Sequence, residues 1–292
     1  MNKNKHNNRY FNSISFDIEE WYHANYDDVL IDSFQNKATN LEDNVDRLVG
    51  VCEKYRVKST CFVLGTVARD KPEIVRKLHN AGHEIASHGF SHKLVYSMTE
   101  KEFLNELKQS KDILEDITGE SVKGFRAPSW SVREDILDWY YSALEQAGFV
   151  YSSSVYPAYT YLYGIPGFLQ NAHYPEINGA RVNVLEIPVP VFGAFKKYVG
   201  YSGGFYLRFF PAWFIKYLLN RANSKGQSTF IYLHPREIDI NQPRLSLNKL
   251  ESFIHYFGIN GCEQKLDNIL SSISGSCIPI SDGITKINVN QH

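Results

Sequence analysis

Two spacings of hydrophobic residues alternate along the chain. Short apolar runs predict strands, whereas apolar residues three and four positions apart predict helices. Residues 14–18 form the first such run, and residues 99–118 give the clearest helix pattern. Thr99 with Glu102 three residues later is typical of a capping box, and Gly119 is typical of a helix end. Further strands are predicted at 57–65, 83–88, 122–126, 149–153, 183–188 and 228–233, further helices at 42–56, 72–82, 133–147, 211–225, 246–258 and 263–272, and a loose tail at 284–292.

This order of elements predicts an α/β fold in a single domain. Strands that alternate with helices favour a parallel sheet, and 292 residues are enough for a closed or partly open barrel. Periodicity alone does not separate such a barrel from an open, doubly wound sheet. Residues 155–181 interrupt the pattern with scattered Tyr, Pro and Gly, and loops of this length are usually functional. We expect this insertion to border a ligand cleft.

Three short segments carry polar residues suited to a metal site. In the first strand Asp17 and Glu19 point to one face and Glu20 to the other, because strand side chains alternate. His88 and His92 are four apart, which places both imidazoles on one side of a helical turn. Neutral imidazole and carboxylate are common zinc ligands, so the two pairs together predict a metal centre.

Other interpretations of these segments are simpler. The acidic residues could form a solvated turn at the end of the strand. The pair His83 and Glu84 suggests the H-E-x-x-H protease signature, but the next histidine, His88, comes one residue too late for it. The protease interpretation is therefore rejected.

Four motifs follow one another along the chain: Asp17 with Glu19, GHEIASHGFSH at 82–92, GFRAPSWS at 124–131 and YLHP at 232–235. In this order they resemble the motifs of the polysaccharide deacetylases, carbohydrate esterase family four with its NodB-homology domain. The resemblance is closest to the branch associated with bacterial exopolysaccharide assembly, whose opening motif is D-V-E-D rather than D-D-G. It covers a catalytic domain at about 11–258, leaves 259–292 as a C-terminal extension, and implies a distorted (β/α)7 barrel.

The resemblance also implies roles for individual residues. Most relatives use aspartate where Glu19 stands, so Glu20 is the alternative ligand, and Ser152 stands where relatives usually have an aspartate. By the resemblance, Asp17 is the catalytic base, Arg126 orients that base, His234 is the general acid, and Glu19, His88 and His92 bind Zn²⁺ or another divalent transition metal. The expected substrate is an N-acetylated polysaccharide or oligosaccharide. Trp130 and Tyr22 are predicted to stack on a sugar, and Gly204 to bring backbone N–H groups close to it.

Three other functions fit the same residues. One is an amide hydrolase acting on a small cyclic or nucleotide-linked sugar substrate. Another is a non-catalytic glycan-binding relative, although binding alone needs neither a base nor an acid. A third is a non-haem iron oxygenase, which shares the set of two histidines and one carboxylate.

Composition excludes several classes of partner. The net charge is −1 and the sequence pI is about 6.8, so no nucleic-acid footprint is expected. No run approaches the about 20 apolar residues of a membrane span, and the N-terminus lacks a secretory signal, which predicts a cytoplasmic protein. Four cysteines without a C-x-x-C pair are expected to be reduced and buried. The oligomeric state is not predicted.

Overall fold

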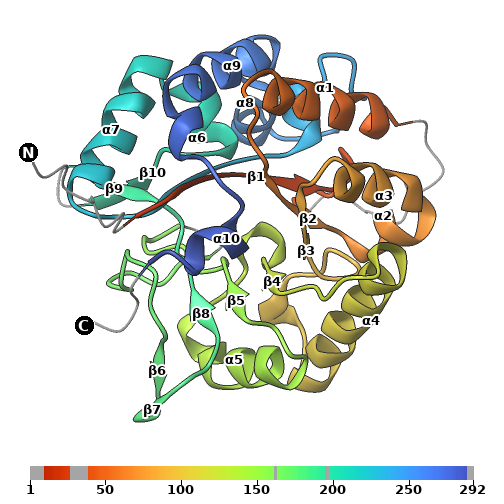
Figure 1. Cartoon of the computed structure of the whole chain (residues 1–292), viewed down its shortest axis with the longest axis vertical. Helices are drawn as coiled ribbons and strands as arrows, with labels where there is room; N and C mark the ends of the chain where they lie inside the picture. The colour runs from red at the N-terminus through yellow and green to blue at the C-terminus, as the bar shows by residue number, and fades with distance from the viewer. Residues whose placement is uncertain (1–9, 27–38, 161–162, 195–196, 288–292) are drawn as a thin grey trace, which may run out of the picture.

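The computed structural model describes residues 10–26, 39–160, 163–194 and 197–287, and its centre is a curled sheet of parallel strands surrounded by helices (Figure 1). The sheet has seven strands in the order β11-β1-β2-β3-β4-β5-β8, and every pairing in it is parallel. Within the described ranges β8 and β11 are not paired, so the sheet forms a half-barrel. This confirms the distorted (β/α)7 barrel. The strands are β1 (Asn12–Ile18), β2 (Thr60–Val63), β3 (Glu84–Ser87), β4 (Gly124–Phe125), β5 (Tyr151–Ser152), β8 (Leu185–Glu186) and β11 (Thr229–Leu233).

The remaining elements surround this sheet. The helices are α1 (Leu41–Lys54), α2 (Gly65–Asp70), α3 (Pro72–Asn80), α4 (Glu100–Thr118), α5 (Leu137–Gln146), α6 (Gly204–Phe209), α7 (Ala212–Ser224), α8 (Lys249–Tyr256), α9 (Cys262–Ile273) and α10 (Ile280–Ile284). Two antiparallel hairpins lie outside the main sheet, β6 (Glu176–Ile177) with β7 (Ala180–Arg181), and β9 (Val191–Ala194) with β10 (Lys197–Gly200). No helix of the described segments combines the length and the apolar character that a membrane crossing needs.

Strand β1 is buried on both faces, and its two faces differ in chemistry. Ile14, Phe16 and Ile18 belong to the hydrophobic core beneath the helices. Ser15 and Asp17 alternate with them and contact Arg126 inside the barrel. The expected period of two is therefore present, and it delivers polar side chains to the interior of the sheet.

Each predicted strand and helix overlaps an observed one, and the bounds differ by a few residues. The capping box of Thr99 and Glu102 opens α4, and Gly119 ends it with a φ of 71°. The predicted strand at 57–65 was too long, because Gly65 begins α2 instead. A Cβ at Gly65 would lie 2.5 Å from Phe90, and the Gly65 N–H donates to the carbonyl of Gly89. Contacts with this distant segment, which periodicity does not reveal, start the helix.

Three further predictions concern the cysteines, the C-terminal tail and the domain boundary. The cysteines are free and buried, as expected. The helix α6, the helix α10 and the two hairpins were not predicted, because each is too short to show a period. The tail at 284–292 begins at the last residue of α10, and 288–292 lie outside the described residues. The boundary at 258 stays a prediction, although α9 buries Leu266, Ile269, Leu270 and Ile273 in the main core.

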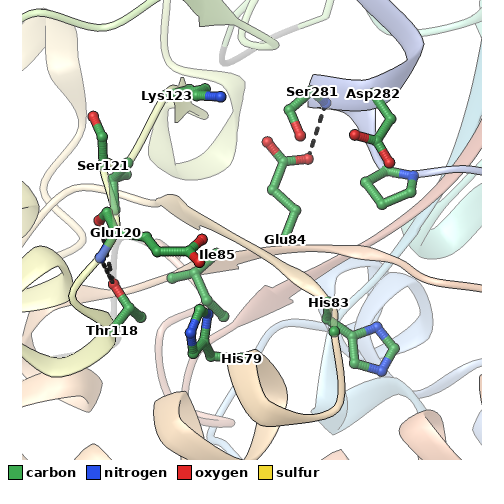
Figure 2. Close-up of a pocket in the computed structure, with 13 residues that line it drawn as sticks. His79, His83, Glu84, Ile85, Thr118, Glu120, Ser121, Lys123, Ser281 and Asp282 are labelled. Carbon is green, nitrogen blue, oxygen red and sulfur yellow. Dashed lines mark hydrogen bonds between the residues drawn. The ribbon is translucent and has the colours of Figure 1, made fainter.

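Glu84 is a half-buried residue at the start of β3, and its carboxyl group is well supplied with hydrogen-bond donors. It accepts hydrogen bonds from Thr60 Oγ1 at 2.7 Å, Tyr151 Oη at 2.8 Å and the Ser281 N–H at 3.1 Å, the last of which Figure 2 shows. Burial raises the pKa of Glu84, and these hydrogen bonds lower it only in part. The folded protein therefore holds a proton here at a pH where the unfolded chain has released it.

This raised pKa predicts a specific loss of stability with rising pH. The Glu84 contribution should fall as pH rises from the unfolded value of 4.5 towards the higher folded value, by about 1.4 kcal/mol per unit of pKa difference. We expect Glu84→Gln to remove that part of the pH dependence in urea unfolding measured between about pH 4 and pH 8. Identical pH profiles for wild type and variant would contradict the assignment. The exposed Glu120 supplies the matched control, Glu120→Gln.

Candidate metal and catalytic centre

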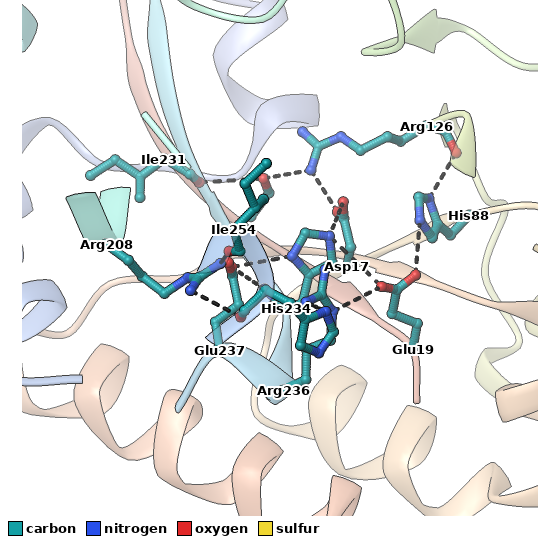
Figure 3. Close-up of polar contacts among 12 residues, drawn as sticks. Asp17, Glu19, His88, Arg126, Arg208, Ile231, His234, Arg236, Glu237 and Ile254 are labelled. Carbon is teal, nitrogen blue, oxygen red and sulfur yellow. Dashed lines mark hydrogen bonds and ion pairs between the residues drawn. The ribbon is translucent and has the colours of Figure 1, made fainter. Parts of the chain in front are cut away.

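Three potential metal ligands meet at the carboxyl ends of β1 and β3, and Figure 3 labels two of them, Glu19 and His88. One ligand atom from each of Glu19, His88 and His92 lies within 4.8 Å of the others, and all three residues are buried. Glu19 Oε2 is 2.5 Å from His92 Nε2 and 3.6 Å from His88 Nε2. Parallel strands place the residues that follow them at one edge of the sheet, which is why segments 65 or more residues apart converge here.

Glu20 points elsewhere. Its carboxylate lies 3.2 Å from Lys71 Nζ, at the start of α3, and it is not part of the group formed by Glu19 and the two histidines. The alternation along the strand therefore places Glu19, rather than Glu20, next to His88 and His92. Burial raises the pKa of Glu20, and the Lys71 charge partly opposes that shift.

The expectation of a helical turn between His88 and His92 was wrong. Residues 88–92 form an irregular loop, in which Gly89 has a φ of 78° and His92 a φ of 62°. The carboxylate of Glu106, on α4, holds this loop by accepting from the N–H groups of Phe90 at 3.1 Å and Ser91 at 2.8 Å. A positive φ is costly for histidine, so its presence indicates that the surroundings enforce the conformation.

Asp17 and Arg126 form a fully buried ion pair beside these ligands. Arg126 Nη1 donates to Asp17 Oδ1 at 2.6 Å and to Ser15 Oγ at 2.8 Å, and Nε donates to the carbonyl of Ser153 at 3.3 Å. Because Oδ1 faces the guanidinium, Oδ2 remains on the side of the histidines. Aromatic rings enclose the guanidinium, with ring centroids 3.9–5.9 Å from its carbon; they belong to Phe62, Trp130, Phe230 and Tyr232.

His234 completes the group from the end of β11. Its Nε2 lies 3.7 Å from Asp17 Oδ2 and 3.8 Å from Glu19 Oε1. Its Nδ1 lies 3.2 Å from Glu237 Oε2, and Glu237 in turn accepts from Arg208 Nε at 3.0 Å. One ring nitrogen is thus tied to a carboxylate, while the other faces the candidate centre.

Glu237 and Arg208 were not predicted. The spacing of His234 and Glu237 in H-P-R-E places a carboxylate one turn after the histidine, and this signal is visible in the sequence. Arg208 is 29 positions before Glu237 and has no local signal. It is buried on α6, where it also donates to the carbonyls of Ile254 at 2.9 Å and His255 at 3.1 Å.

The charges of the site follow from burial and from opposite charges nearby. Burial raises the pKa of Glu19, but His92 and His234 lower it more, so it stays an anion. Burial lowers the pKa of His92 more than Glu19 raises it, which keeps the imidazole neutral. Burial lowers the pKa of His234, but Glu19 and Glu237 outweigh that effect and leave it above the usual value. The centre therefore combines an anionic and a neutral ligand with a readily protonated histidine.

These residues fit a divalent transition metal. Glu19 Oε2 is buried and makes no regular hydrogen bond among the described residues; the polar atoms beside it are the Nε2 atoms of His88 and His92, and a cation held between these three atoms would satisfy it. His88 Nδ1 pairs with the carbonyl of Arg126 at 2.9 Å, so its Nε2 carries the free lone pair. Two imidazoles with one carboxylate are a set that zinc and related ions accept, with positions left for water and substrate.

His23 is a third buried histidine near this centre that was not predicted to belong to it. Its ring stacks on His92, with centroids 5.2 Å apart and planes at 27°. Its Nδ1 accepts from the Glu20 N–H at 3.0 Å. Burial lowers the pKa of His23 to about 3, so this ring stays neutral and supports the ring of His92 by packing.

The predicted sugar-binding residues are placed near the site, but two of them are largely covered. Trp130 is 5% exposed and packs against Arg126, with a φ of 55°. Tyr22 is 7% exposed, with its ring 4.7 Å from that of His23. Gly204 begins α6 with a φ of 55°, next to the ring of Tyr232. Contact of these residues with a sugar stays a prediction, and so does the placement of 155–181 beside a cleft.

Comparisons with known proteins agree with this fold. Residues 23–151 match the polysaccharide deacetylase family model, and residues 153–276 match a domain of unknown function, DUF3473. The chain therefore contains a polysaccharide deacetylase domain.

Several individual proteins are similar to this chain in sequence or in fold. The peptidoglycan-N-acetylglucosamine deacetylase of Bacillus cereus is 31% identical over 93 residues, which are 32% of this chain and 34% of that protein. This chain thus spans about a third of the length of the curated relatives it matches. A Mycobacterium smegmatis structure assigned to the polysaccharide deacetylases has a TM-score of 0.64 at 18% identity, with 96% of this chain and 92% of that chain covered. A solved allantoinase, PuuE, reaches 0.61 at 15% identity, covering 97% and 91%, and shares the fold.

The arrangement of ligands predicts which carboxylate controls metal content. We expect wild-type protein to bind about one divalent transition metal ion per chain, and Glu19→Ala and His88→Ala to bind it more than about tenfold more weakly. Glu20→Ala is the matched control and should retain the metal. Elemental analysis after dialysis measures the metal content, and titration with Zn²⁺ measures the affinity. Metal loss in Glu20→Ala with retention in Glu19→Ala would reverse the assignment.

Proposed function

We propose that this chain is a metal-dependent hydrolase that removes N-acetyl groups from N-acetylated sugar residues of a bacterial polysaccharide or its precursor. The observation that carries the proposal is the 3.7 Å separation of Asp17 Oδ2 and His234 Nε2 beside the three-residue donor set. A base and an acid at one point are what amide hydrolysis requires, and the deacetylase domain supports that reaction.

Glu19, His88 and His92 would hold the metal. When bound there, a zinc-type ion supplies an acidified water molecule and polarises the carbonyl oxygen of the acetamide. The anionic Glu19 and the neutral His92 match the protonation states that ligands need. Zn²⁺ is the ion that we propose, and the same donors also accept other divalent transition ions.

Asp17 is proposed as the general base. Arg126 binds Oδ1 and keeps the carboxylate ionised and fixed, while Oδ2 faces the site. Oδ2 would take a proton from the attacking water, whose oxygen forms the new bond to the acetamide carbon. Ser15 and Ser153 prevent Arg126 from turning away, because they accept further hydrogen bonds from it.

His234 is proposed as the general acid. The sugar nitrogen leaves poorly as an anion, so the C–N bond breaks as His234 Nε2 gives its proton to that nitrogen. The products are acetate and a free amine on the sugar. Glu237, held by Arg208, binds Nδ1 and so keeps Nε2 directed at the reacting group.

The D-x-E form of the first motif supports a finer proposal, that the substrate is a bacterial exopolysaccharide. Named relatives act on peptidoglycan, chitin or chitooligosaccharide, so N-acetylhexosamine chains are the class to test first. A non-catalytic glycan-binding protein would not need Asp17, Arg126 and His234 to be aligned at one point.

Asp17→Asn should separate metal binding from turnover. We expect the variant to retain its metal and to lose about 10²–10⁴-fold in acetate release from N-acetylhexosamine oligomers, because the base is gone while the ligands remain. The exposed Asp70, paired with Arg69, gives the matched control Asp70→Asn, which should keep full activity. Thermal unfolding confirms that each variant is folded. Undiminished turnover in Asp17→Asn would eliminate Asp17 as the base, and no acetate from wild type would favour glycan binding.

Glu237→Gln should lower kcat while KM and metal content stay close to wild type. A glutamine carries no charge, so it no longer stabilises the protonated imidazole of His234. The acid contributes about 10²–10⁴-fold to the rate, and part of that contribution should be lost. We therefore expect kcat to fall at least about tenfold. Glu263→Gln removes an exposed glutamate that pairs with Arg47, and it should leave kcat unchanged. Steady-state kinetics on one oligomer measure these effects. A rise in KM alone would show that Glu237 serves binding rather than the acid.

A further inference from the structure

Exposed large apolar side chains gather on one part of the surface. Among the described residues, eleven large hydrophobic side chains are exposed, and six of them lie on α6, the start of α7, and α8 with the residue that caps it. Figure 1 shows α6 and α7 on the same side of the barrel. We name this group the aromatic surface; its exposed members are Phe209, Trp213, Tyr217, Leu250, Phe253 and Phe257.

The aromatic surface is continuous across helices that are separate in sequence. The ring of Phe209, on α6, lies 5.8 Å from that of Phe257, and the ring of Phe253 lies 5.0 Å from Phe257. Trp213 and Tyr217 extend the surface along α7 at a spacing of four residues, and they are 69% and 55% exposed. Contiguous exposed apolar patches on soluble proteins usually mark a place of interaction.

Basic residues predominate on the helices that carry the aromatic surface: α6, α7 and α8 contain four Lys and Arg residues and one acidic residue, Glu251, which belongs to the capping box of α8. Between Glu186 and Glu237 the sequence has seven Lys and Arg residues and no Asp or Glu. Arg221 and Lys225, at the end of α7, are exposed beyond Tyr217. The nearest acidic residues on α9 do not offset this charge, because Glu263 pairs with Arg47 and Asp267 with Lys54.

We propose that the aromatic surface docks on an anionic lipid surface, with α7 lying in the plane of the headgroups. Trp and Tyr favour the membrane interface, Phe and Leu enter the acyl boundary, and basic residues attract anionic headgroups. Charge favours this occupant over a second copy of the chain, whose matching surface would bring like charges together. The side chains favour lipid over glycan as well, because the phenyl rings that dominate the surface carry no hydrogen-bonding groups.

The docked surface is joined rigidly to the candidate centre. Arg208 extends inward from α6 to Glu237, and it also bonds to carbonyls at the end of α8. A protein bound to lipid through α6 and α8 would therefore present His234 close to the membrane. This placement of His234 rests on the proposed function and puts the glycan substrate at the membrane surface.

Trp213 provides a direct spectroscopic test with the full chain. It is the exposed tryptophan, whereas Trp21 and Trp130 are buried and Trp139 is half-buried. We expect vesicles of mixed phosphatidylglycerol and phosphatidylcholine to shift its emission to the blue and to sediment the protein. Vesicles of phosphatidylcholine alone should do so at least about tenfold more weakly, and about 0.5 M NaCl should weaken the binding.

Variants separate the contributions of apolar and charged residues. Phe209→Ser with Phe253→Ser should weaken vesicle binding at least about tenfold, and Arg221→Glu with Lys225→Glu about as much. Trp213→Phe should keep binding but lose the blue shift. Tyr159→Ser is the matched control, because Tyr159 is 81% exposed but lies in the 155–181 segment, and it should bind as wild type does. Acetate release from soluble oligomers should be unchanged in all of these variants, so a failure of docking is distinguishable from a failure of the proposed function.

Three results would overturn the docking proposal. One is the absence of sedimentation and of any blue shift with anionic vesicles. Another is a dimer in solution that Phe209→Ser dissociates, without vesicle binding, which would assign the surface to self-association. The third is a blue shift with N-acetylglucosamine oligomers but not with vesicles, which would assign the surface to glycan.

Discussion

The buried ion pair of Asp17 and Arg126 is the interaction on which the rest of the structure depends. Both groups are almost completely removed from water, and removing either one would leave an uncompensated charge inside the barrel. The barrel offsets that cost with Ser15 and Ser153, which accept further hydrogen bonds from the guanidinium, and with the surrounding aromatic rings. The pair connects β1 to β4 and β5, and it directs the free oxygen of Asp17 towards His234. Stability of the interior and alignment of the candidate base thus have one physical origin.

The candidate centre crosses the boundary between the two matched family segments. Asp17 and Glu19 precede the polysaccharide deacetylase match at 23–151, while His88, His92 and Arg126 lie within it. His234, Glu237 and Arg208 lie within the DUF3473 match at 153–276. Because β8 and β11 of the second segment belong to the same sheet as β1 to β5, the two matches share one sheet. The segment of unknown function therefore supplies the candidate acid and both residues that hold it.

Backbone strain is concentrated around the same centre. Of the five non-glycine residues with positive φ in the described ranges, three lie here: His92, Ser129 and Trp130. The last two follow Arg126 and Pro128, and they turn the chain so that the Trp130 ring covers the guanidinium. Such conformations cost about 1–3 kcal/mol each and persist only where many contacts enforce them. Glu106 beneath the His92 loop is one such contact.

The sequence by itself determined the parts that depend on local periodicity and capping. The alternation along 14–20 separated Asp17 and Glu19 from Glu20, and the capping box with Gly119 defined α4, because these features involve only neighbouring residues. The tertiary structure decided what depends on distant partners. The loop geometry of His92 depends on Glu106, the burial of Trp130 depends on Arg126, and the support of His234 depends on an arginine 26 positions before it. No period or motif encodes these contacts, because they exist only after the strands have brought their carboxyl ends together at one edge of the sheet.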